Sequence, residues 1–321
     1  MNDPVVRGLN RVLGLQLGAV QQHFIHVLML GAWGEAAVAN RITSIDAVDL
    51  PNALRIVDFV VSTGHPPSLA ADRRSLAVDM PKPGDGLNVV LNAELQLDRR
   101  LKGVLASVER ELAPYARNAP IELVSVPLGC RDAYQDWLEQ RVEYPGDEAN
   151  RGEIAGPASL GLDSLFASLM VMINQTLVHA FVHWHGGERG LADSAWEMSG
   201  AAMMHAAAVV DSLARRHLAP NPAHAVMLGH VELPRVATGS PEALESDRLL
   251  AERCHAAARR AALARQEGDL AAACGRIEAY CLGLAGWRPG QGLPRLDNPC
   301  VDFRRVLRDY VWTGSTSSAA G

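Results

Sequence analysis

The stretch that decides the fold is Asn174 to Pro222, NQTLVHAFVHWHGGERGLADSAWEMSGAAMMHAAAVVDSLARRHLAPNP. It has the pattern of two long helices joined by the glycine pair Gly186-Gly187. The same pattern occurs 153 residues earlier, in Gln21 to Pro67, with no gap. The identities at this offset are Gln22 with Gln175, His26 with His179, Gly34-Glu35 with Gly187-Glu188, Ala39 with Ala192, Ala53 with Ala206, Val57-Asp58 with Val210-Asp211, Pro4 with Pro157, Leu91 with Leu244, Leu97 with Leu250 and Arg100 with Arg253. An offset that holds over this length indicates an internal duplication.

The composition is that of a helical globular protein. Hydrophobic residues make up 48% of the 321 residues and charged residues 21%, whereas aromatics reach only 5%. The net charge of −6 gives no indication of a nucleic-acid partner. The five cysteines are an odd number without paired spacing, which favours reduced thiols in a cytoplasm. The opening residues lack the pattern of a signal peptide, and no uninterrupted apolar run of about 18 residues predicts a membrane span.

Helical spacing and turn residues predict the same order of elements in each half. The expected helices are about 4–31, 34–62, 88–112 and 130–142 in the first half, and 163–185, 190–218, 241–266 and 269–284 in the second. Proline at position 51 is expected to kink the second helix or to shift its start. Two short-turn helix pairs joined by a long crossover have the connectivity of a ferritin-like four-helix bundle. The expected divisions are domain 1 at 1–145, a linker at 146–156, domain 2 at 157–286, and an extension at 287–321 whose tail is disordered.

Several motifs resemble bacterioferritin. Leu13 to His26 is similar to the first helix of that family, and Trp33-Gly34 is similar to its Trp-Gly turn. Ile173 to Gln175, followed by His179-Ala180, repeats the match, and Ala133 to Glu139 resembles the fourth helix. The resemblance implies an all-α fold of two tandem ferritin-like four-helix bundles, arranged as a fused pseudo-dimer. The first two helices of each half would then form the mutual interface, with Trp33, Trp184 and Trp196 near it.

The iron ligands of that family are not retained. A ferritin-like di-iron centre uses two Glu-x-x-His pairs and two further carboxylates. The corresponding positions hold Gln16, Asp49, Asn52, Asp98, Arg131 and Tyr134 in the first half, and Leu169, Ala202, His205, Ala251, Ala273 and Arg276 in the second. An ordinary ferroxidase centre is therefore not expected. The polar set Gln16, Asp49, Asn52 and Asp98 is expected at one level of the first bundle. It is either a hydrogen-bonded structural network or a catalytic or substrate pocket, because buried polar groups are costly unless satisfied.

The second half offers a different candidate metal site. Glu252 and His255 form a Glu-x-x-His pair, and the repeat places His205 at about the same depth. Two imidazoles and one carboxylate would suit a mononuclear iron, copper or zinc ion, with Cys254 or Glu278 nearby. A solvated helix face is the alternative interpretation of the same pair.

The resemblance suggests roles for two further residues. His179 aligns with a family histidine outside the metal centre, so it is expected to cap or pack, with metal binding as the alternative. Met203 aligns with the methionine that ligates haem between bacterioferritin subunits, but its repeat partner is Leu50. Haem would then need a homodimer through the second halves, and a core methionine is the simpler interpretation.

Two functional hypotheses follow. The first is a cytoplasmic metal-dependent oxidoreductase that diverged from bacterioferritin-like ancestors and acts on a small organic molecule rather than storing iron. The second is a metal-free scaffold, binding protein or cofactor-independent enzyme that uses the polar pocket of the first half. Neither hypothesis expects a nucleic-acid or membrane partner, and both allow a homodimer.

Overall fold

The computed structural model describes residues 3–68, 87–117, 119–142, 159–214, 237, 239–263 and 268–294. These residues are helical and contain no strand, which confirms the all-α class. The helices are α1 (Pro4–Ala32), α2 (Ala36–Ser62), α3 (Leu87–Leu112), α4 (Glu122–Val142), α5 (Ser159–His185), α6 (Arg189–Ala214), α8 (Ser240–Leu263) and α9 (Asp269–Ala285). The expected linker at 146–156 and the expected disordered tail lie outside the described residues.

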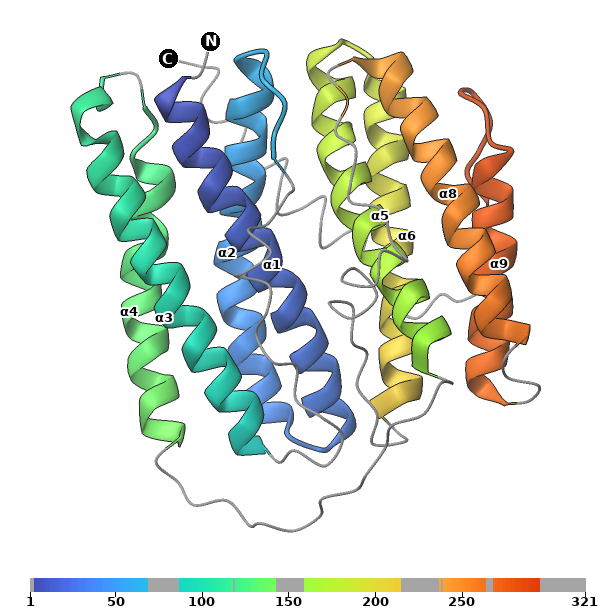
Figure 1. Cartoon of the computed structure of the whole chain (residues 1–321), viewed down its shortest axis with the longest axis horizontal. Helices are drawn as coiled ribbons and strands as arrows, with labels where there is room; N and C mark the ends of the chain where they lie inside the picture. The colour runs from blue at the N-terminus through green and yellow to red at the C-terminus, as the bar shows by residue number, and fades with distance from the viewer. Residues whose placement is uncertain are drawn as a thin grey trace.

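The helices form two groups of four that lie side by side (Figure 1). In the first group, α1 and α4 each contact both α2 and α3. In the second group, α5 and α9 each contact both α6 and α8. The two groups thus use the same order of helix pairing, and we refer to them as the first and second bundles.

The repeat in the sequence is also a repeat in the structure. The ends of α1 and α5, the starts of α2 and α6, and the starts of α3 and α8 each lie 153 residues apart. The turn glycines Gly34 and Gly187 have the same spacing, and their φ angles are 86° and 81°. Residues with a side chain rarely adopt this left-handed backbone conformation. A glycine at each turn therefore lets the chain reverse without strain.

The two bundles contact each other through reciprocal positions. Helix α1 contacts α6, and α2 contacts α5. Ile25 belongs to the core of the second bundle, and its repeat equivalent Val178 belongs to the core of the first. Leu28 packs against the core of the second bundle, and its repeat equivalent Phe181 packs against the core of the first. This is the pattern of an isologous dimer interface, here formed within one chain.

The tryptophans expected near this interface have different surroundings. Trp33 packs against the core clusters of both bundles. Trp196 lies edge-on to Phe181, with ring centroids 6.1 Å apart, and so is close to the interface. Trp184 is more exposed and carries the Arg189 guanidinium 5.1 Å above its ring.

One helix start differs from the sequence-based expectation, and two prolines lie inside helices. Helix α4 starts at Glu122 rather than near residue 130, and it continues through the buried Pro127. Helix α2 also runs continuously through Pro51. In both cases tertiary packing outweighs the lost backbone hydrogen bond that makes proline a helix breaker in isolated sequence.

Helix α5 supplies the most apolar segment of the described chain. Gly161–His185 is long and apolar enough to cross a membrane, with a mean hydropathy of 1.7. However, 89% of its most apolar window is buried inside the protein. A long apolar helix that its neighbours enclose to this extent is a core helix of the bundle.

Candidate metal centre

The interior of the first bundle contains a cluster of polar and charged side chains from all four helices. Each helix contributes one pair at a spacing of three or four residues, which places both members on one face. The pairs are His23 and His26 on α1, Asp46 and Asp49 on α2, Glu94 and Asp98 on α3, and Arg131 and Tyr134 on α4. All are buried except Asp46, whose side chain is 20% exposed. We call these eight residues the polar cluster.

Glu94 is at the centre of one half of the polar cluster. Its Oε2 atom lies 3.0 Å from Nε2 of His23 and accepts a 3.1 Å hydrogen bond from the Tyr134 hydroxyl. Its Oε1 atom contacts Nδ1 of His26. On the other side of the His23 ring, Nδ1 lies 2.7 Å from Oδ1 of Asp46. The His23 imidazole is therefore held between two carboxylates from different helices.

Arg131 is at the centre of the other half. Its guanidinium forms an ion pair with Asp49 and donates a 2.7 Å hydrogen bond from Nη1 to Oδ1 of Asp98. The Arg131 and Asp98 side chains are fully buried and Asp49 is nearly so. Burying charges in this way is expensive unless they pair closely, so each of these groups depends on the others.

The polar cluster shifts the pKa values of its members. Burial would lower the pKa of His23, but the carboxylates of Glu94 and Asp46 outweigh it and raise the pKa to about 10. Burial would raise the pKa of Glu94, but His23 and His26 hold it well below its usual range. Burial raises the pKa of Asp46, and His23 offsets part of that rise. Burial lowers the pKa of Arg131 to about 10, which leaves its guanidinium charged at neutral pH.

Within the described residues, one group could hold a metal ion: His23, Asp46 and Asp49, whose ligand atoms lie within 4.8 Å of one another. The charges fit a cation, because four buried or half-buried carboxylates face one guanidinium and two imidazoles. Two carboxylate oxygens, Oδ1 of Asp49 and Oδ2 of Asp98, have no hydrogen-bond partner among the described residues. One imidazole and two carboxylates form a suitable ligand set for a divalent first-row transition ion.

The pKa of His23 predicts how stability depends on pH. The pKa of His23 is higher in the folded protein than in the unfolded chain, so protonation of His23 stabilises the fold. This stabilisation is fully present below about pH 6.5 and is lost as the pH rises toward about 10. The lowered pKa of Glu94 acts in the opposite sense, and its stabilisation is lost as the pH falls below about 4.5. We expect the free energy of unfolding to fall by roughly 3 kcal/mol between pH 6.5 and 9.5. Urea denaturation across this range should show a smaller decline for His23→Gln. His65→Gln, whose hydrogen bonds within the described part of the chain are to nearby Thr63, should follow the wild type.

The four residues predicted as a polar pocket in the first bundle are all buried, but they form two separate sets of contacts. Asn52 donates hydrogen bonds to Oε1 of Gln16, at 3.1 Å, and to the carbonyl of Leu123, at 2.7 Å. Asp49 and Asp98 instead share Arg131. Gln16 and Asn52 therefore form a hydrogen-bonded structural link. A catalytic role for any of the four stays a prediction.

The structure does not gather the three ligands predicted in the second bundle. The exposed Glu252 forms an ion pair with Arg248, and Nδ1 of His255 donates to the carbonyl of Glu278 at 3.1 Å. His205 is buried with its ring 4.9 Å from that of Tyr280, and burial lowers its pKa to about 4. A metal ion at these residues gains no support from these contacts.

His179 and Met203 have surroundings that suit packing roles. His179 is fully buried, with Nδ1 2.8 Å from Oδ1 of Asp247 and Nε2 accepting from the Ala237 amide at 3.2 Å. Met203 is half-buried and packs against the core of the second bundle. Cys254, expected near the metal, is buried, and a hydrogen bond with Cys281 raises its pKa well above the usual range.

The sequence interpretation missed His23, Asp46 and Glu94 because, in the first half, it considered only positions that correspond to ferritin ligands. A local signal was available: pairs of ligand residues at helical spacing occur on three successive predicted helices. Comparing the positions of those pairs along the length of the bundle would have placed them at the same level. Arg131 could not have been assigned in this way, because an arginine on a helix is usually exposed.

No protein-family model matches this chain, and no curated protein matches it significantly.

Proposed function

We propose that this protein binds one divalent transition-metal ion, with iron as the first candidate, through His23, Asp46 and Asp49. The observation that carries the proposal is the convergence of these ligand atoms within 4.8 Å inside a buried cluster of four carboxylates, although burial raises the pKa of Asp46 and raises that of Asp98 to about 7. We further propose that the protein is a diverged ferritin-like oxidoreductase that acts on a small organic molecule. The repeated pairing order of the helices supports that ancestry.

The surroundings of His23 suit a metal ligand. With Nδ1 toward the ion, Nε2 faces Glu94 at 3.0 Å. A carboxylate behind a ligating imidazole fixes the orientation of the ring and increases its basicity. Asp46 is the most exposed member of the group, with 20% of its side chain exposed, so we propose that a small molecule would approach on its side. A bound ion of this type would supply Lewis-acid or one-electron redox chemistry.

Metal content tests the proposal directly. Protein purified without chelators should contain about one iron, zinc or copper ion per chain by elemental analysis, and equilibrium dialysis should show saturable binding of Fe²⁺. Asp46→Asn should weaken the binding at least about tenfold, because it removes an anionic ligand but retains the hydrogen-bond acceptor for His23. Asp58→Asn is the matched control, since Asp58 lies on the same helix and pairs on the surface with His185. Binding should also tighten from pH 6 to pH 8, because the ion displaces a proton from His23.

A metal-free function is the second candidate, and the position of Arg131 favours it. The guanidinium already pairs with both Asp49 and Asp98, so it supplies part of the positive charge that an ion would supply. In that case the first bundle would be a scaffold, a binding protein or a cofactor-independent enzyme. Wild-type protein that shows no saturable Fe²⁺, Zn²⁺ or Cu²⁺ binding would reject the metal proposal in favour of this one.

A further inference from the structure

A row of aromatic side chains leads from the polar cluster to the surface of the first bundle. The rings of Tyr134 and Trp137, one turn apart on α4, are stacked with centroids 6.0 Å apart and planes 14° apart. The Tyr134 ring also lies edge-on to the His23 imidazole, with centroids 6.2 Å apart. The guanidinium of Arg41, an exposed residue of α2, lies 5.7 Å above the Trp137 ring. Successive ring contacts therefore connect a candidate metal ligand with a surface arginine.

The burial of the two α4 rings changes along this row. Tyr134 is 2% exposed and belongs to a hydrophobic core, whereas Trp137 is only partly buried and packs against that core. A soluble reagent can therefore approach Trp137 but not Tyr134. An electron can pass between rings in contact without any channel being open, because it tunnels over short distances. The row thus gives a closed interior a way to exchange electrons with the solvent.

The Tyr134 hydroxyl has a proton acceptor in place. It donates a 3.1 Å hydrogen bond to Oε2 of Glu94. Burial and the Glu94 carboxylate raise the pKa of Tyr134 well above its usual value, so the phenol keeps its proton at neutral pH. An oxidised phenol is, by contrast, a strong acid, and its proton can pass to Glu94 along the existing hydrogen bond. This transfer avoids leaving an unpaired positive charge on a buried ring.

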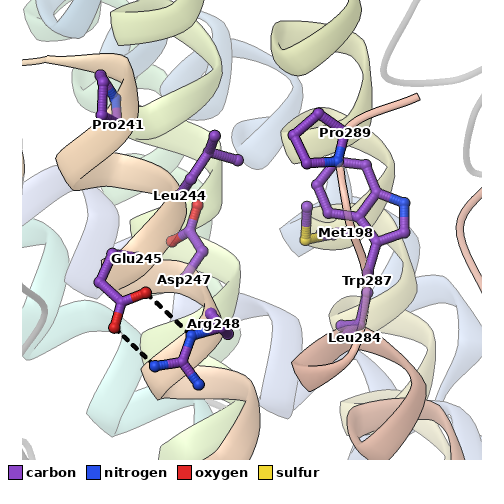
Figure 2. A pocket seen from close by; sticks show the side chains of 9 residues that line it. All are labelled: Met198, Pro241, Leu244, Glu245, Asp247, Arg248, Leu284, Trp287 and Pro289. Carbon is purple, nitrogen blue, oxygen red and sulfur yellow. Dashed lines mark hydrogen bonds and ion pairs between the residues drawn. The ribbon is translucent and has the colours of Figure 1, made fainter. Parts of the chain in front are cut away.

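Trp287 in the second bundle is also partly buried but has different neighbours. Figure 2 shows it with Met198 and Leu284 at a cavity of about 180 Å³, across from the Arg248–Glu245 ion pair. None of the described residues that line this cavity is a tyrosine. Trp287 is therefore a matched control for Trp137.

We propose that Trp137 and Tyr134 pass single electrons between the polar cluster and a one-electron oxidant or reductant at the surface near Arg41. In the oxidising direction, the external oxidant takes one electron from Trp137, and the indole radical cation then takes one from Tyr134. The phenolic proton moves to Glu94, which leaves a neutral Tyr134 radical, a protonated Glu94 and a restored Trp137. Use of this path in turnover rests on the proposed oxidoreductase function, whereas the electron transfer itself requires no metal ion.

Laser flash-quench oxidation tests the proposal on the full chain after dialysis against a chelator. A photo-generated tris-bipyridine ruthenium(III) ion is the oxidant, and transient absorption distinguishes tryptophanyl from tyrosyl radicals. In the wild type, a tyrosyl signal should appear as a tryptophanyl signal decays. Trp137→Phe should lose most of this tyrosyl signal, because it removes the indole but keeps an apolar ring in its place. Trp287→Phe should retain the signal.

Tyr134→Phe gives a second readout that does not depend on how well Trp137→Phe folds. It should lose the tyrosyl signal and prolong the tryptophanyl signal, because the Trp137 radical cation loses its electron donor. Tyr115→Phe, which removes an exposed tyrosine between α3 and α4, should do neither. The proposal is overturned if no tyrosyl radical follows a tryptophanyl one in the wild type. It is also overturned if Trp137→Phe keeps the full signal, or if Trp287→Phe loses as much.

This measurement is separate from the test of metal binding, because it uses protein without bound metal. Radical transfer in a protein that binds no metal would support the electron path and reject the metal proposal. Metal binding without radical transfer would reject the electron path and leave the metal proposal in place.

Discussion

Replacing Arg131 with methionine is expected to lower the free energy of unfolding by about 3–5 kcal/mol at pH 7. The guanidinium is fully buried, and it pairs with both Asp49 and Asp98. Methionine would fill much of the same volume but would leave two buried carboxylates without a counter-charge. Urea denaturation of the wild type and Arg131→Met measures the difference, and the loss should shrink as the pH falls and the carboxylates take up protons.

The matched control for this variant is Arg99→Met. Arg99 pairs with Glu139 on the surface, where both side chains are more than 40% exposed. An exposed ion pair of this kind contributes about 1 kcal/mol or less. If the two variants lose the same stability, Arg131 does not have the role that we assign to it.

Replacing Glu94 with glutamine is expected to have an effect of similar size, about 3–5 kcal/mol near pH 6. The carboxylate contacts His23, His26 and Tyr134 at once, and it contributes to the raised pKa of His23. A neutral amide keeps the shape but removes the charge, so the pKa of His23 should fall well below about 10. A titration of His23 followed by NMR measures the pKa, and chemical denaturation measures the stability.

Glu139→Gln provides the comparison, because it removes a carboxylate from the same bundle at its exposed surface. It should change stability by about 1 kcal/mol or less and should leave His23 unaffected. A His23 pKa that stays near 10 in Glu94→Gln would show that Asp46 alone raises it, and the role of Glu94 would then have to be withdrawn.

The duplication and most helix positions could be predicted from the sequence because they depend on local patterns. Helical spacing, turn glycines such as Gly34 and Gly187, and a constant offset are all visible along the chain. The start of α4 was expected near residue 130, whereas the helix begins at Glu122 and includes the buried Pro127. Proline tolerance depends on packing, which no local pattern records.

The polar cluster was only partly predictable, for a related reason. The burial of Asp49 and Asp98 followed from their register, but their shared partner Arg131 lies at least 33 residues away in the sequence. Such a contact depends on how α4 is rotated in the bundle. The metal site proposed from the sequence at His205, Glu252 and His255 stays a prediction, and the sequence pattern did not indicate that Glu252 would form an ion pair with Arg248.

The reciprocal contacts of Ile25 with the second bundle and of Val178 with the first have an evolutionary consequence. In a dimer of identical chains, every substitution appears twice, so both subunits must tolerate it. Once the two copies are encoded in tandem, each can change alone while the contact between them is maintained. Among the described residues, the first bundle contains a dense set of buried charges, whereas the second contains fewer, including Asp163 and Asp247. Two joined copies can therefore have different interiors while the interface between them is maintained.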